Sequence, residues 1–177
     1  MLGSETRPVP RDRECTCPKG QLERRVARRY VRGMTRSGAG GHEQGQPTGE
    51  PPLVAIVDDD ASVRRSTSRL IRSFGYRAEA FASGEEFLTS PLAGQSAALV
   101  LDVRMPDMDG LAVQCQVAAR YLDIPVVFIS GRASEEEERR ARSAGAIEFL
   151  RKPIATPTLW KVLRKLFQGG DGHENDA

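Results

Sequence analysis

The sequence predicts a doubly wound α/β domain, in which a five-stranded parallel sheet carries helices on both faces. Five short, largely apolar runs recur along the chain, at residues 53–57, 77–81, 97–101, 125–129 and 147–150. Runs of this length are typical of parallel strands that are covered on both faces. Amphipathic segments separate the runs, and this alternation is typical of doubly wound α/β domains. Ligands of such sheets bind beyond the carboxyl ends of the strands, so a site is expected at that edge.

The first two helices each carry a start or stop signal. Apolar residues recur with helical spacing from residue 63 to residue 74, and Gly75 suits the left-handed position that ends a helix. A short second helix through Leu88 is predicted because Ser83 and Glu86 have the spacing of a capping box.

Three further helices complete the alternation. Residues 110–121 are predicted to form the third helix of the pattern. Ser134 and Glu137 have capping-box spacing and open an arginine-rich helix that ends at Gly145. The Thr-Pro pair at 156–157 predicts an N-cap followed by proline at the first helical position of the last helix.

Composition divides the 177 residues into a basic arm, a folded domain and a short acidic tail. Residues 1–52 carry ten Lys and Arg against six Asp and Glu, residues 53–167 carry sixteen against fifteen, and residues 168–177 carry none against three. The arm is rich in Arg, Gly, Pro, Ser and Gln, so we expect it to be disordered. A basic amphipathic helix around residues 22–34 is the alternative for part of the arm.

No apolar run approaches the roughly 20 residues that a membrane helix needs. No apolar segment follows the N-terminal charges, as it would in a secretory signal. We therefore expect a cytoplasmic protein with no membrane partner.

Three consecutive acidic residues, Asp58, Asp59 and Asp60, follow the apolar run 53–57 directly. Neighbouring carboxylates repel one another and raise each other's pKa unless a cation neutralises them. Oxygen ligands of this kind suit Mg²⁺. The alternative is a solvated turn that caps the next helix, because Asp is a favoured N-cap residue.

The other strands deliver a matching set of polar residues to the same edge. Asp102 ends the third strand, Ser130 the fourth, and Lys152 follows the fifth. Because parallel strands bring their carboxyl ends to one edge, we expect these three residues to converge with Asp58 and Asp59.

The set has the chemistry of a phosphoryl acceptor site. A carboxylate can attack phosphorus to give an aspartyl phosphate, and the transfer is mostly a matter of positioning and charge stabilisation. Lys152 would supply a compact positive charge, and the hydroxyl of Ser130 could bind a phosphoryl oxygen. Taken singly, Asp102 could merely cap a loop, Ser130 could be a turn residue and Lys152 a solvated surface lysine.

Residues 53–167, about two thirds of the chain, resemble the receiver domain of two-component response regulators. The matching segments, in order along the chain, are 57–60 (VDDD), 101–110 (LDVRMPDMDG), 129–131 (ISG) and 149–153 (FLRKP). The resemblance implies a flavodoxin-like fold with strand order 2-1-3-4-5.

The resemblance also implies a role for each residue of the acidic cluster. Asp102 would be phosphorylated by a sensor histidine kinase or a phosphotransfer protein. Asp59 would ligate Mg²⁺ directly, Asp58 would assist, and Asp102 and the backbone carbonyl of Arg104 would complete the protein ligands. Asp60 ranks below its two neighbours as a ligand, and helix capping is its expected role.

Ser130 and Lys152 would bind the phosphoryl group. Phe149 resembles the switch aromatic that packs inward when Ser130 moves toward the phosphate. The peptide between Lys152 and Pro153 resembles a cis bond of the family, and cis bonds are essentially a proline phenomenon.

The leading hypothesis is thus a phosphorylation-dependent response regulator of a phosphorelay. It is a signalling module and not a turnover enzyme, apart from its own phosphorylation and dephosphorylation. It would switch the binding of a downstream protein or form a phosphorylation-dependent homodimer, without specific DNA binding. One alternative is a Mg²⁺-dependent phosphatase that uses Asp58 and Asp60, like the haloacid dehalogenase-like hydrolases. The other is a DNA-binding regulator truncated of its output domain.

Overall fold

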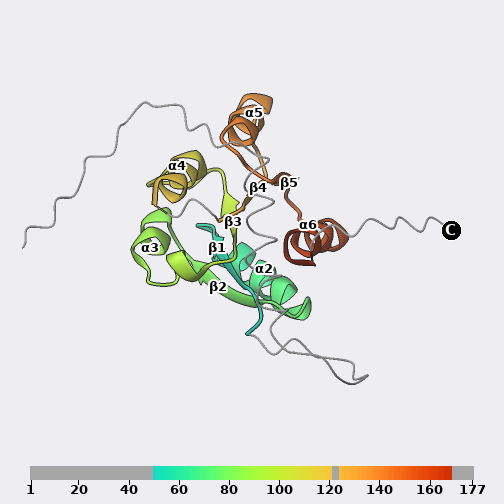
Figure 1. The fold of residues 1–177 in the computed structure, drawn as a ribbon. Coiled ribbons are helices and arrows are strands. Elements are labelled where there is room, and N and C mark those ends of the chain that lie inside the picture. The colour runs from blue at the N-terminus through green and yellow to red at the C-terminus, as the bar shows by residue number, and fades with distance from the viewer. Residues whose placement is uncertain (1–49, 121–123, 169–177) are drawn as a thin grey trace, which may run out of the picture.

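The computed structural model describes residues 50–120 and 124–168, which build a five-stranded sheet between helices (Figure 1). The strands are β1 (Leu53–Val57), β2 (Arg77–Phe81), β3 (Ala98–Asp102), β4 (Val126–Ser130) and β5 (Glu148–Arg151). All are parallel, in the order β2-β1-β3-β4-β5, which confirms the predicted fold class and strand order. Residues 1–49 of the predicted disordered arm and residues 169–177 of the acidic tail lie outside the described residues.

The helices are α2 (Ala61–Ser73), α3 (Gly84–Thr89), α4 (Gly110–Arg120), α5 (Glu135–Ser143) and α6 (Thr156–Gln168), with a short 3₁₀ helix η1 (Ala93–Gln95) before β3. The sequence did not predict η1. Helices α2 and α6 cover one face of the sheet, and α3, α4 and α5 cover the other (Figure 1).

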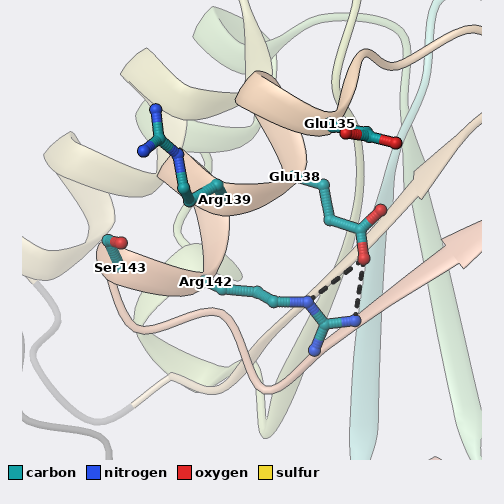
Figure 2. A pocket seen from close by; sticks show the side chains of 5 residues that line it. All are labelled: Glu135, Glu138, Arg139, Arg142 and Ser143. Atoms are coloured by element: carbon teal, nitrogen blue, oxygen red, sulfur yellow. Dashed lines mark hydrogen bonds and ion pairs between the residues drawn. The ribbon is translucent and has the colours of Figure 1, made fainter.

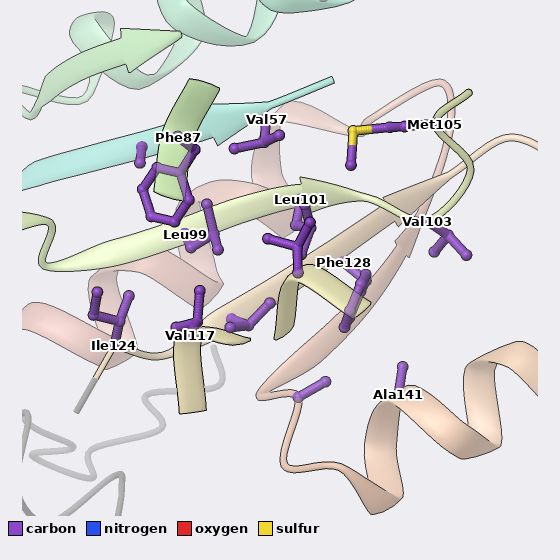
Figure 3. Close-up of a cluster of buried hydrophobic side chains, with 14 of the residues drawn as sticks. Val57, Phe87, Leu99, Leu101, Val103, Met105, Val117, Ile124, Phe128 and Ala141 are labelled. Carbon is purple, nitrogen blue, oxygen red and sulfur yellow. The ribbon is translucent and has the colours of Figure 1, made fainter. Parts of the chain in front are cut away.

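Alternate residues of each central strand enter different cores. Leu99 and Leu101 of β3 pack with Phe87 of α3 and Val117 of α4 in one apolar cluster (Figure 3). Val100, between them in sequence, belongs to the cluster under α2 and α6. This two-residue period explains why the central strands are apolar at every position before their polar carboxyl ends.

Local hydrogen bonds start the helices that the sequence predicted, with two corrections. The capping box of α5 is complete, because Ser134 and Glu137 each bind the other's backbone N–H. The box of α3 is half formed: Ser83 accepts from the N–H of Glu86, but the Glu86 carboxylate accepts from Ala82 instead, at 2.6 Å. Thr156, expected as an N-cap, already lies within α6.

Strand register brings the polar strand ends together. Val57 of β1 pairs with Leu101 of β3, so Asp58 and Asp102 are the next residues along two neighbouring strands. Asp102 in turn pairs with Ile129, one residue before Ser130. The convergence expected at the carboxyl edge therefore follows directly from the pairing.

Among the residues that the structure describes, no helix has the length and apolar character needed to cross a bilayer.

Candidate functional site

Lys152 joins two aspartates at the carboxyl edge of the sheet. Its Nζ lies 2.7 Å from Oδ2 of Asp58 and 2.9 Å from Oδ1 of Asp102. The Asp58 side chain is fully buried, that of Asp102 is 7% exposed, and that of Lys152 is 23% exposed. The backbone after β5 turns at a cis peptide between Lys152 and Pro153, as the family resemblance implied. Three strands thus contribute to one ion-pair network.

Burial and the neighbouring charges have opposite effects on the pKa values of Asp102 and Lys152. Burial raises the pKa of Asp102, with a further rise from the nearby Asp58 carboxylate, and these effects outweigh the lowering by Lys152 and the Arg104 N–H. Burial alone would lower the pKa of Lys152, but its hydrogen bonds to the two aspartates outweigh this and raise it. The lysine therefore stays charged and is the cation that keeps two buried carboxylates together.

The acidic cluster meets the requirements of a hard cation. Asp58, Asp59 and Asp102 each offer a carboxylate oxygen, and these three atoms lie within 4.8 Å of one another. Asp59 is exposed, so an ion could reach the cluster from solvent. A donor set made of carboxylate oxygens fits Mg²⁺ better than a soft metal. The N–H of Arg104 donates to Oδ2 of Asp102 at 3.2 Å, so the chain folds back beside this carboxylate. The role of the Arg104 carbonyl as a ligand stays a prediction.

Asp60 caps a helix in the structure. Its Oδ1 accepts hydrogen bonds from the N–H groups of Ser62 at 2.7 Å and Val63 at 3.2 Å, at the start of α2. These two bonds lower its pKa. The capping role expected for Asp60 is therefore the one observed.

Ser130 lies next to the ion-pair network, and Phe149 lies in an apolar cluster below the sheet edge. Ser130 is buried; its Oγ accepts from the Arg132 N–H at 3.3 Å, and its carbonyl accepts from the Lys152 N–H at 2.8 Å. Phe149 is also buried and stacks on Phe128, with ring centroids 6.1 Å apart. Phe149 therefore lies inward in this structure. The switch roles of Ser130 and Phe149 stay predictions.

Two arginines contribute contacts that sequence reasoning missed. Nη1 of Arg64 donates to the carbonyls of Asp58 at 2.7 Å and Asp59 at 2.9 Å, which fixes the turn between β1 and α2. The guanidinium of Arg104 pairs with Glu137 of α5 at 2.9 Å. An arginine one turn into the helix could have suggested the first contact. The second joins residues 33 positions apart, and no local pattern signals it.

Gly110 was also missed as a site residue. Its N–H donates to the Val103 carbonyl at 2.8 Å. A Cβ at this position would stand 2.2 Å from the carbonyl oxygen of Asp102. Glycine is required there because the start of α4 lies directly against the end of β3.

Two surface grooves lie away from Asp102. The first, of about 620 Å³, runs along α5 and is lined by Glu135, Glu138, Arg139, Arg142 and Ser143 (Figure 2). The second, of about 280 Å³, follows α2, where Arg64, Arg65, Arg69 and Arg72 line it with three small residues. The acidic cluster belongs to neither groove; within it Asp59 is exposed, whereas Asp58 and Asp102 are buried.

Comparison with known proteins gives one consistent family. The sequence pattern of the response regulator receiver domain matches residues 54–164. Nodulation protein W of Bradyrhizobium diazoefficiens is 40% identical over 117 residues, covering 66% of this chain and 50% of that protein. Response regulator protein TmoT of Ectopseudomonas mendocina is 42% identical over 114 residues, covering 63% and 51%. The chain therefore spans about half the length of these curated relatives.

Solved structures agree with the sequence comparison. The response regulator StyR is 41% identical with a TM-score of 0.61, covering 67% of this chain and 60% of that one. A response regulator receiver protein from Burkholderia phymatum is 36% identical with a TM-score of 0.58, covering 66% and 95%.

Proposed function

The chain belongs to the family of response regulator receiver domains, and from this premise we propose that Asp102 accepts a phosphoryl group from a phosphohistidine. The observation that carries the proposal is the buried Asp102 carboxylate, held by Lys152 beside two further aspartates. The donor would be a sensor histidine kinase or a phosphotransfer protein, which places the reaction in the cytoplasm. The output would be a change in protein binding, so the domain acts as a switch and not as a turnover enzyme.

The transfer forms an Asp102 Oδ–P bond and breaks the P–N bond of the donor histidine, whose imidazole leaves with the bonding electron pair. Mg²⁺, when bound by Asp58, Asp59 and Asp102, supplies positive charge that offsets repulsion between the carboxylates and the phosphoryl oxygens. The ammonium group of Lys152 contacts Oδ1 of Asp102, so a small movement would bring it to the oxygens of the incoming phosphoryl group. The Arg104 N–H holds Oδ2 and orients the carboxylate.

The switch would use Ser130, which is hydrogen-bonded to Lys152, and Phe149, which stacks on Phe128. Ser130 follows the residue paired with Asp102, and a rotated hydroxyl could bind the phosphoryl group. Phe149 has no hydroxyl to solvate, so burial on Phe128 favours its inward position. Phosphorylation would then shift populations around α5, β5 and α6 and change binding of a downstream protein or a second copy.

One relative, from Thauera aromatica, is named a transcriptional regulatory protein, and this chain covers 51% of it. We propose protein contact, without specific DNA binding, as the output of the receiver domain. The phosphatase alternative needs Asp60 as an acid, and Asp60 is committed to capping α2.

Labelling with a small acyl phosphate tests the proposal. We expect one phosphoryl group per chain, dependent on Mg²⁺ and absent from Asp102→Asn, measured by intact mass. Asp107→Asn is the matched control, because Asp107 is an exposed aspartate on the same loop, and it should label like the wild type. Equal labelling of wild type and Asp102→Asn would overturn the assignment, and steady turnover of a generic phosphate ester would favour the hydrolase.

A further inference from the structure

Arg104 contacts both the acceptor and a distant helix. Its backbone N–H donates to Asp102 Oδ2 at 3.2 Å. Its side chain forms a two-pronged ion pair with Glu137, from Nε to Oε1 at 3.1 Å and from Nη2 to Oε2 at 2.9 Å. Two parallel bonds of this kind hold the guanidinium in one orientation. A single residue thus joins the end of β3 to the start of α5.

Glu137 is also the residue that closes the first turn of α5. Its Oε2 accepts from the N–H of Ser134 at 2.7 Å and from the Ser134 hydroxyl at 3.0 Å. The bonds from Arg104 first, and from Ser134 second, lower the pKa of Glu137 to about 2. The carboxylate is therefore shared between the cap of α5 and Arg104.

The remaining ion pairs of α5 hold a different part of the helix. Arg142 pairs with Glu138 at 3.0 Å and with Glu148 of β5 at 3.1 Å. Glu138 also accepts from Arg151 of β5, at 3.4 Å. These contacts tie the body of the helix to β5. The Arg104 contact acts instead on its first turn, which follows the loop after Ser130.

Phosphorylation of Asp102 would change the competition for Arg104. A phosphoryl group adds charge of roughly −1.5 to −2 and strong acceptor oxygens. The Arg104 backbone N–H already donates to Asp102 Oδ2, so the new anion would form beside the backbone of the residue that carries the guanidinium. A guanidinium group binds two phosphate oxygens at once, in the same way that it binds the two oxygens of a carboxylate. Glu137 would keep its two bonds from Ser134 after losing Arg104.

We propose that the Arg104–Glu137 ion pair is the contact through which α5 responds to modification of Asp102. In the unmodified protein the pair holds the first turn of α5 against the β3–α4 loop. A phosphoryl group on Asp102 draws Arg104 away, and the first turn of α5 is released. Arg104 is a positioning residue in this scheme, and the inference rests on the proposed phosphorylation of Asp102.

Glu137→Gln separates this coupling from helix capping, because Gln can replace Glu in a capping box but cannot form the ion pair. Arg104→Gln removes the pair from the other side. Glu136→Gln is the matched control, since it breaks an exposed ion pair between Glu136 and Arg139 on the same helix. The readout is amide hydrogen exchange of residues 134–138, with and without Mg²⁺ and beryllofluoride as a phosphoryl substitute.

In wild type and Glu136→Gln, beryllofluoride should speed exchange in this turn by about two- to fivefold, the range expected from an exposed ion pair. Without beryllofluoride, residues 134–138 of Glu137→Gln, Arg104→Gln and the double variant should already exchange faster than in the wild type, and beryllofluoride should not raise these rates further. The double variant should exchange no faster than either single variant, because both substitutions remove the same ion pair. Intact-mass labelling is run on each variant.

A full wild-type response in variants that still label would overturn the coupling and leave the proposed function intact. The coupling would also be overturned, with the proposed function intact, if the wild type labels but beryllofluoride does not change amide exchange of residues 134–138. Failure of the wild type to label would overturn both the coupling and the proposed function.

Discussion

Replacement of Lys152 by Met tests the central ion-pair network. The change removes the ammonium but keeps most of the aliphatic stem. Two buried carboxylates would then face each other with oxygens no more than 4.8 Å apart, and their repulsion is about 3.5 kcal/mol at an effective dielectric constant of about 20. Lys152 is 23% exposed, so solvent screens part of this effect. We expect the free energy of unfolding to fall by about 2–3 kcal/mol in the absence of Mg²⁺.

The assay is urea unfolding of the full chain in EDTA and in saturating Mg²⁺. Mg²⁺ should restore most of the lost stability, because it binds the native carboxylates and not the unfolded chain. Asp102→Asn in the Lys152→Met background should also restore stability by removing one of the two charges. Lys161→Met, on the exposed face of α6, is the matched control and should change stability by less than about 0.5 kcal/mol.

The pH dependence has a defined sign. Burial raises the pKa of Asp102, and loss of the lysine would raise it further. A carboxyl whose pKa is higher in the folded state binds more protons there, so its contribution to stability falls as pH rises. The difference in the free energy of unfolding between Lys152→Met and the wild type should therefore become smaller as the pH falls through this raised pKa. The reasoning is refuted if the variant is as stable as Lys161→Met without Mg²⁺, or if neither Mg²⁺ nor acid makes this difference smaller.

Three further changes have expected outcomes. Gly110→Ala should lower the free energy of unfolding by about 1–3 kcal/mol, because the new Cβ would lie 2.2 Å from a backbone carbonyl oxygen. Gly131→Ala is the control: its new Cβ would have its nearest contact at 3.9 Å, and chemical unfolding should show almost no change in stability. Phe149→Ala should cost about 3–5 kcal/mol by leaving a cavity beside a buried ring, and a loss below about 1 kcal/mol would contradict the inward packing. Asp59→Asn should abolish Mg²⁺ binding in calorimetry while Asp60→Asn retains it, and equal losses would contradict the capping assignment.

The elements of the fold were predictable because their signals are local. The apolar runs, the helical spacings and the Ser134–Glu137 capping box each depend on residues within one turn or one strand. The five strands were located within one residue of their observed bounds. The error at Ser83 was local too: the pattern allowed a capping box, but the Glu86 carboxylate bonded a different N–H.

The candidate site was predictable as a set of residues but not as a geometry. Parallel strands bring their carboxyl ends to one edge, so polar residues at strand ends must converge. That argument placed Asp58, Asp102 and Lys152 together without deciding their contacts. The lysine reaches across 94 positions to Asp58, and the same ammonium also reaches Asp102.

The sequence by itself determined the succession of strands and helices along the chain and the types of side chain at the carboxyl edge of the sheet. Both depend on residues that are neighbours in the sequence. Tertiary structure alone decided that Lys152 bridges the two buried aspartates and that Arg104 pairs with Glu137. It also decided that Phe149 lies inward on Phe128. These contacts depend on strand register and side-chain rotamers, which are selected by packing between segments far apart in the chain.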